Sequence, residues 1–237
     1  GAARGIGAAT ARLVAERGGK VFALDIARDG LNSLQKELAL PDNQIATIDL
    51  GNQASVKENI EKKKKVGIGL HSTCQAKYWN NPGGWQKVVD YLNENGYEVV
   101  LYSKENDGYM NNFHPKGITK FESGTIERLI EDLASCEFFI GLGSGLSWLA
   151  WAVGLPVVLI SGFSEEYSET TKNTYRVINK SVCNGCFNRH RLNASDWMWC
   201  PDHQNTERQF ECTKSISPDM VIDKINLLIQ DKKEKSY

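Results

Sequence analysis

The sequence predicts an α/β protein with parallel sheets, because helical and strand-like segments alternate along most of its 237 residues. Apolar runs at residues 66–70, 97–102 and 137–141 have the length and composition of buried strands, and amphipathic segments separate them. Hydrophobic residues make up 41% of the chain, which is enough to fill a core, and the length suits one large or two small domains.

The charge of the chain excludes two broad classes of partner. Its net charge is −1 at pH 7, so no overall positive field attracts nucleic acid or an anionic membrane surface. No apolar run reaches the roughly 18 residues of a membrane-spanning helix, and the first residues carry no signal-peptide pattern. We therefore expect a cytoplasmic protein that neither binds nucleic acid nor inserts into a membrane.

A run of lysines at residues 62–65 separates two sections of alternating elements. In the first, residues 1–60, we predict helices to about residue 17 and near 29–38, and strands over 20–25 and 44–49. The glycines Gly1, Gly5 and Gly7 would let the backbone turn tightly and approach a pyrophosphate at the start of the first helix. Asp25 ends the next strand, where a carboxylate can bond the ribose of an adenine dinucleotide.

This first pattern resembles the start of a short-chain dehydrogenase/reductase over residues 1–50 and implies a partial Rossmann segment that would bind NAD(P). The rest of that family's pattern is missing. None of the eight tyrosines has a lysine four residues later, although the family needs that pair for proton transfer, and the chain begins inside the glycine motif. An NAD(P)-dependent oxidoreductase is therefore the alternative hypothesis rather than the leading one.

The second section, residues 66–237, carries the longer run of alternating elements. After the strand at 66–70, we predict helices over 83–95, 124–134 and 145–153, and strands over 97–102, 137–141 and 156–160. A polar, aromatic and cysteine-bearing stretch from Tyr175 to Cys212 interrupts the alternation. A last amphipathic helix begins near Ser217 and Pro218, where serine can cap and proline fits the first turn.

Two loops of this section carry residues suited to a phosphorylated ligand. Lys77 lies in the loop after the strand at 66–70, and open α/β sheets bind ligands at the carboxyl ends of their strands. Residues 143–146 form a glycine-rich turn that leads from a strand directly into a helix, whose free amide hydrogens attract anions. Glu105 follows the strand at 97–102.

Together these motifs resemble the C-terminal domain of family 9-type glycosyltransferases, in particular the autotransporter heptosyltransferases, over about 170 residues. The resemblance implies that residues 66–237 are the nucleotide-sugar-binding, Rossmann-like half of a two-domain-type glycosyltransferase. The donor site that it implies consists of Lys77, Glu105, Gly143, Ser144, Gly145 and Leu146. Gly143 stands where lipopolysaccharide heptosyltransferases carry aspartate, and Trp148 where they usually carry histidine, which favours the autotransporter branch.

The six cysteines fall into two groups. Cys74 and Cys136 lie within or beside apolar elements, so we expect them to be buried thiols. The other four are Cys183, Cys186, Cys200 and Cys212. Because the chain shows no export signal, disulfides are disfavoured and this group reads as a metal site for zinc or iron, with His190 and His203 as alternative ligands.

The surrounding residues, 176–212, resemble the cysteine finger in which autotransporter heptosyltransferases hold iron. The same resemblance implies transfer of a heptose from ADP-heptose to serine hydroxyls of an autotransporter protein, by a family that forms large homo-oligomers. It implies a catalytic base in an acceptor domain that the first section does not match, so no catalytic residue is assigned. A non-catalytic, metal-stapled interaction module is a further alternative, for which exposure of Trp197 and Trp199 would be a sign.

Overall fold

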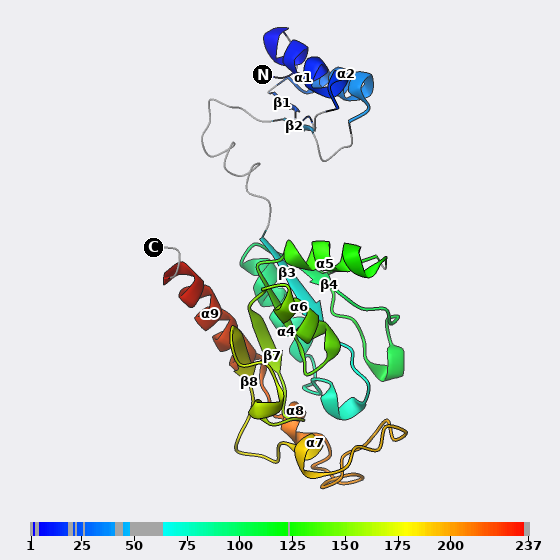
Figure 1. The fold of residues 1–237 in the computed structure, drawn as a ribbon, viewed down its shortest axis with the longest axis vertical. Coiled ribbons are helices and arrows are strands. Elements are labelled where there is room, and N and C mark those ends of the chain that lie inside the picture. The colour runs from blue at the N-terminus through cyan, green and yellow to red at the C-terminus, as the bar shows by residue number, and fades with distance from the viewer. Residues whose placement is uncertain are drawn as a thin grey trace. The chain divides into compact units, whose positions relative to one another are not determined.

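The computed structural model describes residues 2, 5–18, 21, 23–25, 27–40, 45–47, 64–122 and 124–234. The chain divides into two compact units, Gly1–Lys62 and Lys63–Tyr237, which are treated separately below (Figure 1).

The first unit contains two helices and two short parallel strands. In chain order they are α1 (Gly5–Glu16), β1 (Ala23–Asp25), α2 (Arg28–Leu38) and β2 (Ile45–Thr47). Strand β1 pairs with β2 in register, from Ala23 opposite Ile45 to Asp25 opposite Thr47. Helix α2 turns its buried Leu31 and Leu34 into a small core that also contains Ala8 and Ala11 of α1. The predicted order of elements in this section is therefore present in the described residues.

The second unit is built on a six-stranded parallel sheet. In chain order the strands are β3 (Lys64–Gly69), β4 (Tyr97–Leu101), β5 (Thr119–Lys120), β6 (Phe138–Leu142), β7 (Val157–Ile160) and β8 (Thr174–Val177). In space they lie in the order β5-β4-β3-β6-β7-β8. The chain moves outward from β3 on one side and then returns to begin the other half at β6, which is the strand order of a Rossmann-like sheet. The α/β fold predicted from the sequence is confirmed.

Helices cover both faces of this sheet (Figure 1). On one face lie α4 (Gly84–Glu94) and the long α9 (Pro218–Glu234), and on the other lie α5 (Ile126–Ala134) and α6 (Gly145–Ala152). Because side chains alternate along a strand, neighbouring residues of β6 serve different cores: Phe138 packs with the first pair of helices and Phe139 with the second. With both faces covered, all five residues of β6 are buried.

Two strands differ from the sequence expectation. Residues 174–177 form edge strand β8, although we placed Tyr175 at the start of the irregular stretch, and Thr119–Lys120 form the opposite edge strand β5. Both are short and largely polar, because an edge strand buries little side-chain surface. The apolar patterning that revealed the central strands is therefore missing at the two edges.

After β8 the chain enters the cysteine finger, which contains only the short helices α7 (Cys186–Arg189) and α8 (Glu211–Lys214). Figure 1 shows it beyond the edge of the sheet where the parallel strands end. Hydrogen bonds connect this end of the fold to the loop after β3. The Trp79 indole donates to the carbonyl of Ile216 in a buried bond of 2.9 Å, and the backbone N–H of Gln75 donates to the carbonyl of Trp197 at 2.9 Å.

Candidate donor-nucleotide site and cysteine finger

The order in which strands are added to the sheet reverses between β3 and β6, and such a switch point is where a ligand site is expected. Strands β3 and β6 are neighbours in the sheet but lead into loops on opposite sides of it, and ligands of open α/β sheets bind in the crevice between such loops. The loop after β3 carries Lys77 and the loop after β6 carries residues 143–146. Two cavities at this edge are lined by residues of both loops.

The first, which we call the lysine cavity, has a volume of about 210 Å³. Its lining residues are Lys77, Gly143, Ser144, Gly145, Trp148, Phe163, Ser164, Ser168, Glu169 and Phe187. Four of the residues predicted to contact a donor, Lys77 and residues 143–145, therefore lie around one cavity. Trp148, singled out only as a departure from the related enzymes, also lines it and is 42% exposed.

The Lys77 ammonium is held by an aromatic ring instead of a carboxylate. Its Nζ lies 5.5 Å from the centroid of the buried Phe163 ring, within the range of a cation–π interaction. Among the described residues, no carboxylate oxygen lies within 4.0 Å of this nitrogen. Glu169, which lines the same cavity, accepts a hydrogen bond from the Ser164 hydroxyl at 2.5 Å. The ammonium thus keeps donors for an anionic ligand.

Helix α6 begins at the wall of the lysine cavity. Ser144 is its N-cap residue in extended conformation, and its side chain makes no capping hydrogen bond to the helix. The buried Ser147 hydroxyl donates instead to the carbonyl of Leu142 at 2.6 Å, which fastens the first turn to the end of β6. The positive end of the helix dipole and a lysine ammonium consequently face the same small volume, a combination suited to phosphate.

The second cavity, which we call the apolar cavity, has a volume of about 430 Å³. Its walls include the other two residues predicted to contact the donor, Leu146 and Glu105, together with Phe121, Ile126 and Leu129. Gly145 lines one cavity and the next residue, Leu146, lines the other, so the start of α6 lies between them. Apolar side chains on one side and a carboxylate on the other suit a planar base attached to a hydroxyl-bearing sugar.

His71 is a wall residue of the apolar cavity that the sequence analysis did not identify. Its Nδ1 lies 2.7 Å from the Ser103 hydroxyl, which itself accepts the backbone N–H of Glu105 at 3.0 Å. Burial, with the positive charges of His114 and Lys120, lowers the pKa of His71 to about 4. The imidazole is therefore neutral at pH 7 and fixes the backbone of the loop that carries Glu105. A lone histidine after a strand gives no signal of this role in the sequence.

The four finger cysteines are free thiols that share one region of the structure. Burial raises the pKa of Cys183 to about 11 and of Cys186 to about 12. The pKa of Cys212 is raised by burial and then by the charges of Cys183, Cys186 and Cys200, but no three of these four sulfurs all lie within 4.8 Å of one another. A metal ion offsets the cost of forming buried thiolates, and four thiols are a donor set that suits a soft or borderline metal.

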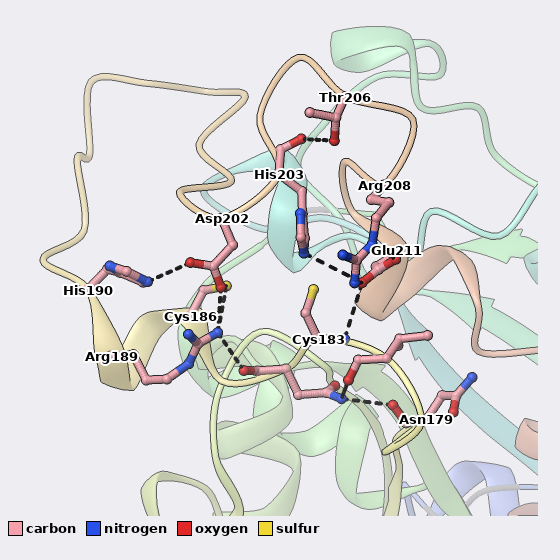
Figure 2. A network of polar contacts seen from close by, with 12 residues as sticks. Asn179, Cys183, Cys186, Arg189, His190, Asp202, His203, Thr206, Arg208 and Glu211 are labelled. Carbon is pink, nitrogen blue, oxygen red and sulfur yellow. Dashed lines mark hydrogen bonds and ion pairs between the residues drawn. The ribbon is translucent and has the colours of Figure 1, made fainter.

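Charged side chains surround the thiols in two groups (Figure 2). Asp202 pairs with Arg189 at 2.6 Å and His190 at 2.8 Å, and the Arg189 Nη2 lies 3.6 Å from the Cys186 sulfur. His190, predicted as an alternative ligand, is therefore occupied by a carboxylate.

Glu211 forms the second group. It accepts two hydrogen bonds from Arg208, at 2.6 and 2.9 Å, and one from the Cys183 backbone at 3.2 Å. Ligand atoms of Cys183, His203 and Glu211 lie within 4.8 Å of one another, so this triad is an alternative metal position. In this triad the Glu211 carboxylate already accepts three hydrogen bonds.

The remaining predicted residues have the following positions. Cys74 and Cys136 are buried, as expected. Trp199 is buried and Trp197 packs edge-on against Tyr78 and Tyr109, so neither ring is the exposed interaction surface considered above.

In the first unit, Gly5 begins helix α1, Gly7 lies in its first turn and Asp25 ends β1. The Asp25 carboxylate accepts the backbone N–H of Ala27 at 3.0 Å. Gly1 lies outside the described residues. NAD(P) binding by these residues stays a prediction.

A six-stranded Rossmann-like sheet with a lysine and a helix terminus at its switch point is typical of nucleotide-binding α/β proteins, glycosyltransferases among them. The model of the glycosyltransferase family 9 (heptosyltransferase) matches residues 16–194, and the chain belongs to this family. The matched range begins in α1 and ends within the cysteine finger.

The curated relatives that match this chain are autotransporter heptosyltransferases. The chain is 49% identical over 158 residues to the autotransporter heptosyltransferase BAHTCr of Citrobacter rodentium, covering 64% of this chain and 38% of the relative. It is 35% identical over 171 residues to BimC of Burkholderia thailandensis, an inactive autotransporter heptosyltransferase, covering 66% of this chain and 38% of that protein.

The crystal structure of TibC from Escherichia coli, an iron-containing dodecameric glycosyltransferase, superposes with a TM-score of 0.67 and 42% identity. The superposition covers 73% of this chain and 46% of TibC, which has also been solved in complex with ADP-D-β-D-heptose. The chain spans about two fifths of the length of the curated relatives it matches. Among the described residues, no helix is both long and apolar enough to cross a membrane.

Proposed function

We propose that the second unit binds ADP-heptose as a glycosyl donor, and that the protein transfers heptose to serine hydroxyls of an autotransporter. One observation carries the proposal. The Lys77 ammonium, without a carboxylate partner among the described residues, and the start of α6 line a single cavity that adjoins the apolar cavity. Family membership and the complex of TibC with ADP-D-β-D-heptose support the same assignment.

The two cavities suggest how the donor is divided between them. The adenine would lie in the apolar cavity against Leu129 and Ile126, with the ribose near Glu105. The diphosphate would cross the start of α6 at Gly145 and reach Lys77, whose charge offsets the negative charge that develops on a departing nucleoside diphosphate. We assign no catalytic base to a residue of this chain.

We further propose that Cys183, Cys186, Cys200 and Cys212 bind one iron ion, or zinc in its place. The free thiols, the chemistry of a four-cysteine donor set and the iron-containing neighbour TibC support this set, although the ligand atoms that the structure places within 4.8 Å of one another are those of Cys183, His203 and Glu211. The metal would act as a structural cross-link between distant parts of the finger. We also propose a cytoplasmic homo-oligomer, in keeping with the dodecameric TibC, and an accessory role for the first unit as a partial dinucleotide-type module.

Titration calorimetry with ADP and AMP tests whether the adenine binds in the apolar cavity and the diphosphate at Lys77. Ile126 is 54% exposed at the rim of the apolar cavity, so Ile126→Glu should leave the fold intact and weaken both nucleotides by a similar factor. Lys77→Gln should weaken ADP more than AMP, since AMP lacks the second phosphate. If neither nucleotide binds the native protein, the proposed function is wrong.

Heptose transfer needs a separate measurement. Incubation with ADP-heptose and an autotransporter passenger domain, followed by mass spectrometry of the acceptor, should reveal serine residues that carry the added heptose. Donor binding without any such mass increase would contradict the transfer proposed here and favour the relationship to inactive BimC.

A further inference from the structure

The loop after β7 lies between the cysteine finger and Lys77. It comprises residues 161–164, and its Phe163 is 4% exposed. One side of this residue faces the donor loop, because Lys77 Nζ lies 5.5 Å from the ring centroid. The backbone carbonyl and the ring of Phe163 also contact residues of the finger. This single ring therefore touches both regions that the function requires.

Backbone hydrogen bonds join the loop to the finger at its C-x2-C pair. The Gly185 N–H donates to the carbonyl of Gly162 at 3.0 Å, and the Phe187 N–H donates to the carbonyl of Phe163 at 3.1 Å. Gly185 and Phe187 flank Cys186 directly in the sequence. A shift of the segment around Cys186 would therefore move the backbone of the loop through these two hydrogen bonds.

Aromatic contacts join the same partners through side chains. The Phe163 ring centroid lies 5.3 Å from that of Phe187 and 5.7 Å from that of Trp199, in tilted and edge-on geometry. Phe187 follows Cys186, and Trp199 precedes Cys200. Two of the four proposed metal ligands are therefore next in sequence to the two rings that fix Phe163, and they belong to different segments of the finger.

We propose that Phe163 is a positioning residue through which the metal-loaded finger fixes the Lys77 ammonium for a nucleoside diphosphate. A metal bound by Cys186 and Cys200 would hold the Phe187 and Trp199 segments at one separation, and Phe163 would keep its place between them. When the finger loosens, the ring no longer holds the ammonium at the lysine cavity, and the diphosphate loses affinity. The inference rests on both the donor site and the metal site of the proposed function.

The test measures ADP affinity by calorimetry in the metal-loaded and chelator-treated protein. The contribution of a cation–π contact predicts that metal removal weakens ADP binding by about two- to thirtyfold in the native sequence. In Phe163→Leu, ADP binds more weakly to the loaded protein and metal removal changes the affinity much less. Equal effects of metal removal in both proteins would overturn the inference, as would ADP affinity that does not depend on metal.

A double-substitution cycle separates positioning from a general loss of structure. In Lys77→Gln, the further change Phe163→Leu should leave ADP affinity unchanged, because the ring acts only through the ammonium. A merely structural role would weaken binding in both backgrounds.

Phe210→Leu is the matched control. It removes a ring that is also 4% exposed, in the same aromatic cluster, and whose cation partner is Lys214 at 6.0 Å. It should lower thermal stability and leave ADP affinity unchanged.

Metal analysis and the native titration separate this inference from its premises. A native protein that binds ADP but neither holds nor takes up iron or zinc would refute the metal site, and with it the coupling. A native protein that holds metal and does not bind ADP would refute the donor site.

Discussion

The contact between Gly162 and the finger yields a sharp stability prediction. A Cβ atom at Gly162 would lie 2.6 Å from the Cys212 carbonyl oxygen and 2.9 Å from the Cys212 Cβ. The first of these atoms is backbone, which cannot swing aside as a side-chain end does, so Gly162→Ala must push the loop and the finger apart. Overpacking of this kind lowers the free energy of unfolding by about 1–3 kcal/mol.

Thermal unfolding measures this loss. For a chain of this size, 1 kcal/mol corresponds to about 2–4 °C, so Gly162→Ala should lower Tm by about 2–12 °C. It should also lower metal retention during gel filtration in chelator. Gly145→Ala is the control, because a Cβ there meets nothing within 4 Å and Tm should not fall. A Gly162→Ala protein with native Tm and native metal retention would refute the close packing of this loop on the finger.

Two further predictions concern pH. Because the folded-state pKa of His71 is lowered to about 4 while its ordinary value is 6.5, the unfolded chain binds more protons in that window, and stability should rise with pH from about 4 to 6.5. Urea titrations of His71→Gln should show a flatter rise, and an NMR midpoint of His71 near its ordinary value would contradict the burial argument. The Lys232 ammonium, 2.6 Å from Glu137, lowers the pKa of that carboxyl, whose contribution is present above about pH 4.5 and lost below it as the carboxyl is protonated. Glu137→Gln should therefore destabilise the protein at pH 7 more than at pH 3, and equal losses at both values would show that the ion pair has no role.

The central strands of the fold are predictable from the sequence because their buried positions are occupied by apolar residues in continuous runs. Strand β6 is Phe-Phe-Ile-Gly-Leu, fully buried, and glycines and serine mark the turn that follows it. The edge strands β5 and β8 are not predictable in this way, since Thr119 and Lys120 are exposed and Thr174–Arg176 are only half-buried. Their strand conformation comes from pairing with β4 and β7, which local patterning does not contain.

The candidate site likewise contains some residues that the sequence predicts and others that it does not. Lys77 and residues 143–146 follow strands at the carboxyl edge, so strand order and motif are enough to bring them together. Phe163, Glu169 and Phe187 were not predicted as wall residues, because they reach the cavity from the loop after β7 and from the finger. Only the packing of the finger on the sheet determines those positions, and it depends on contacts between residues far apart in the sequence.

The measurement that tests the central claim most directly is the titration of ADP into native protein, Lys77→Gln and Lys87→Gln, with NAD as a second ligand. Lys87 is an exposed lysine on α4 that lines neither cavity, so its substitution removes the same charge without touching the site. The account predicts that ADP binds the native and Lys87→Gln proteins alike and binds Lys77→Gln at least tenfold more weakly, roughly the value of one charge-assisted contact of about 1.5 kcal/mol. Equal ADP affinity in all three proteins, or binding of NAD that is lost in Asp25→Ala while ADP does not bind at Lys77, would contradict it.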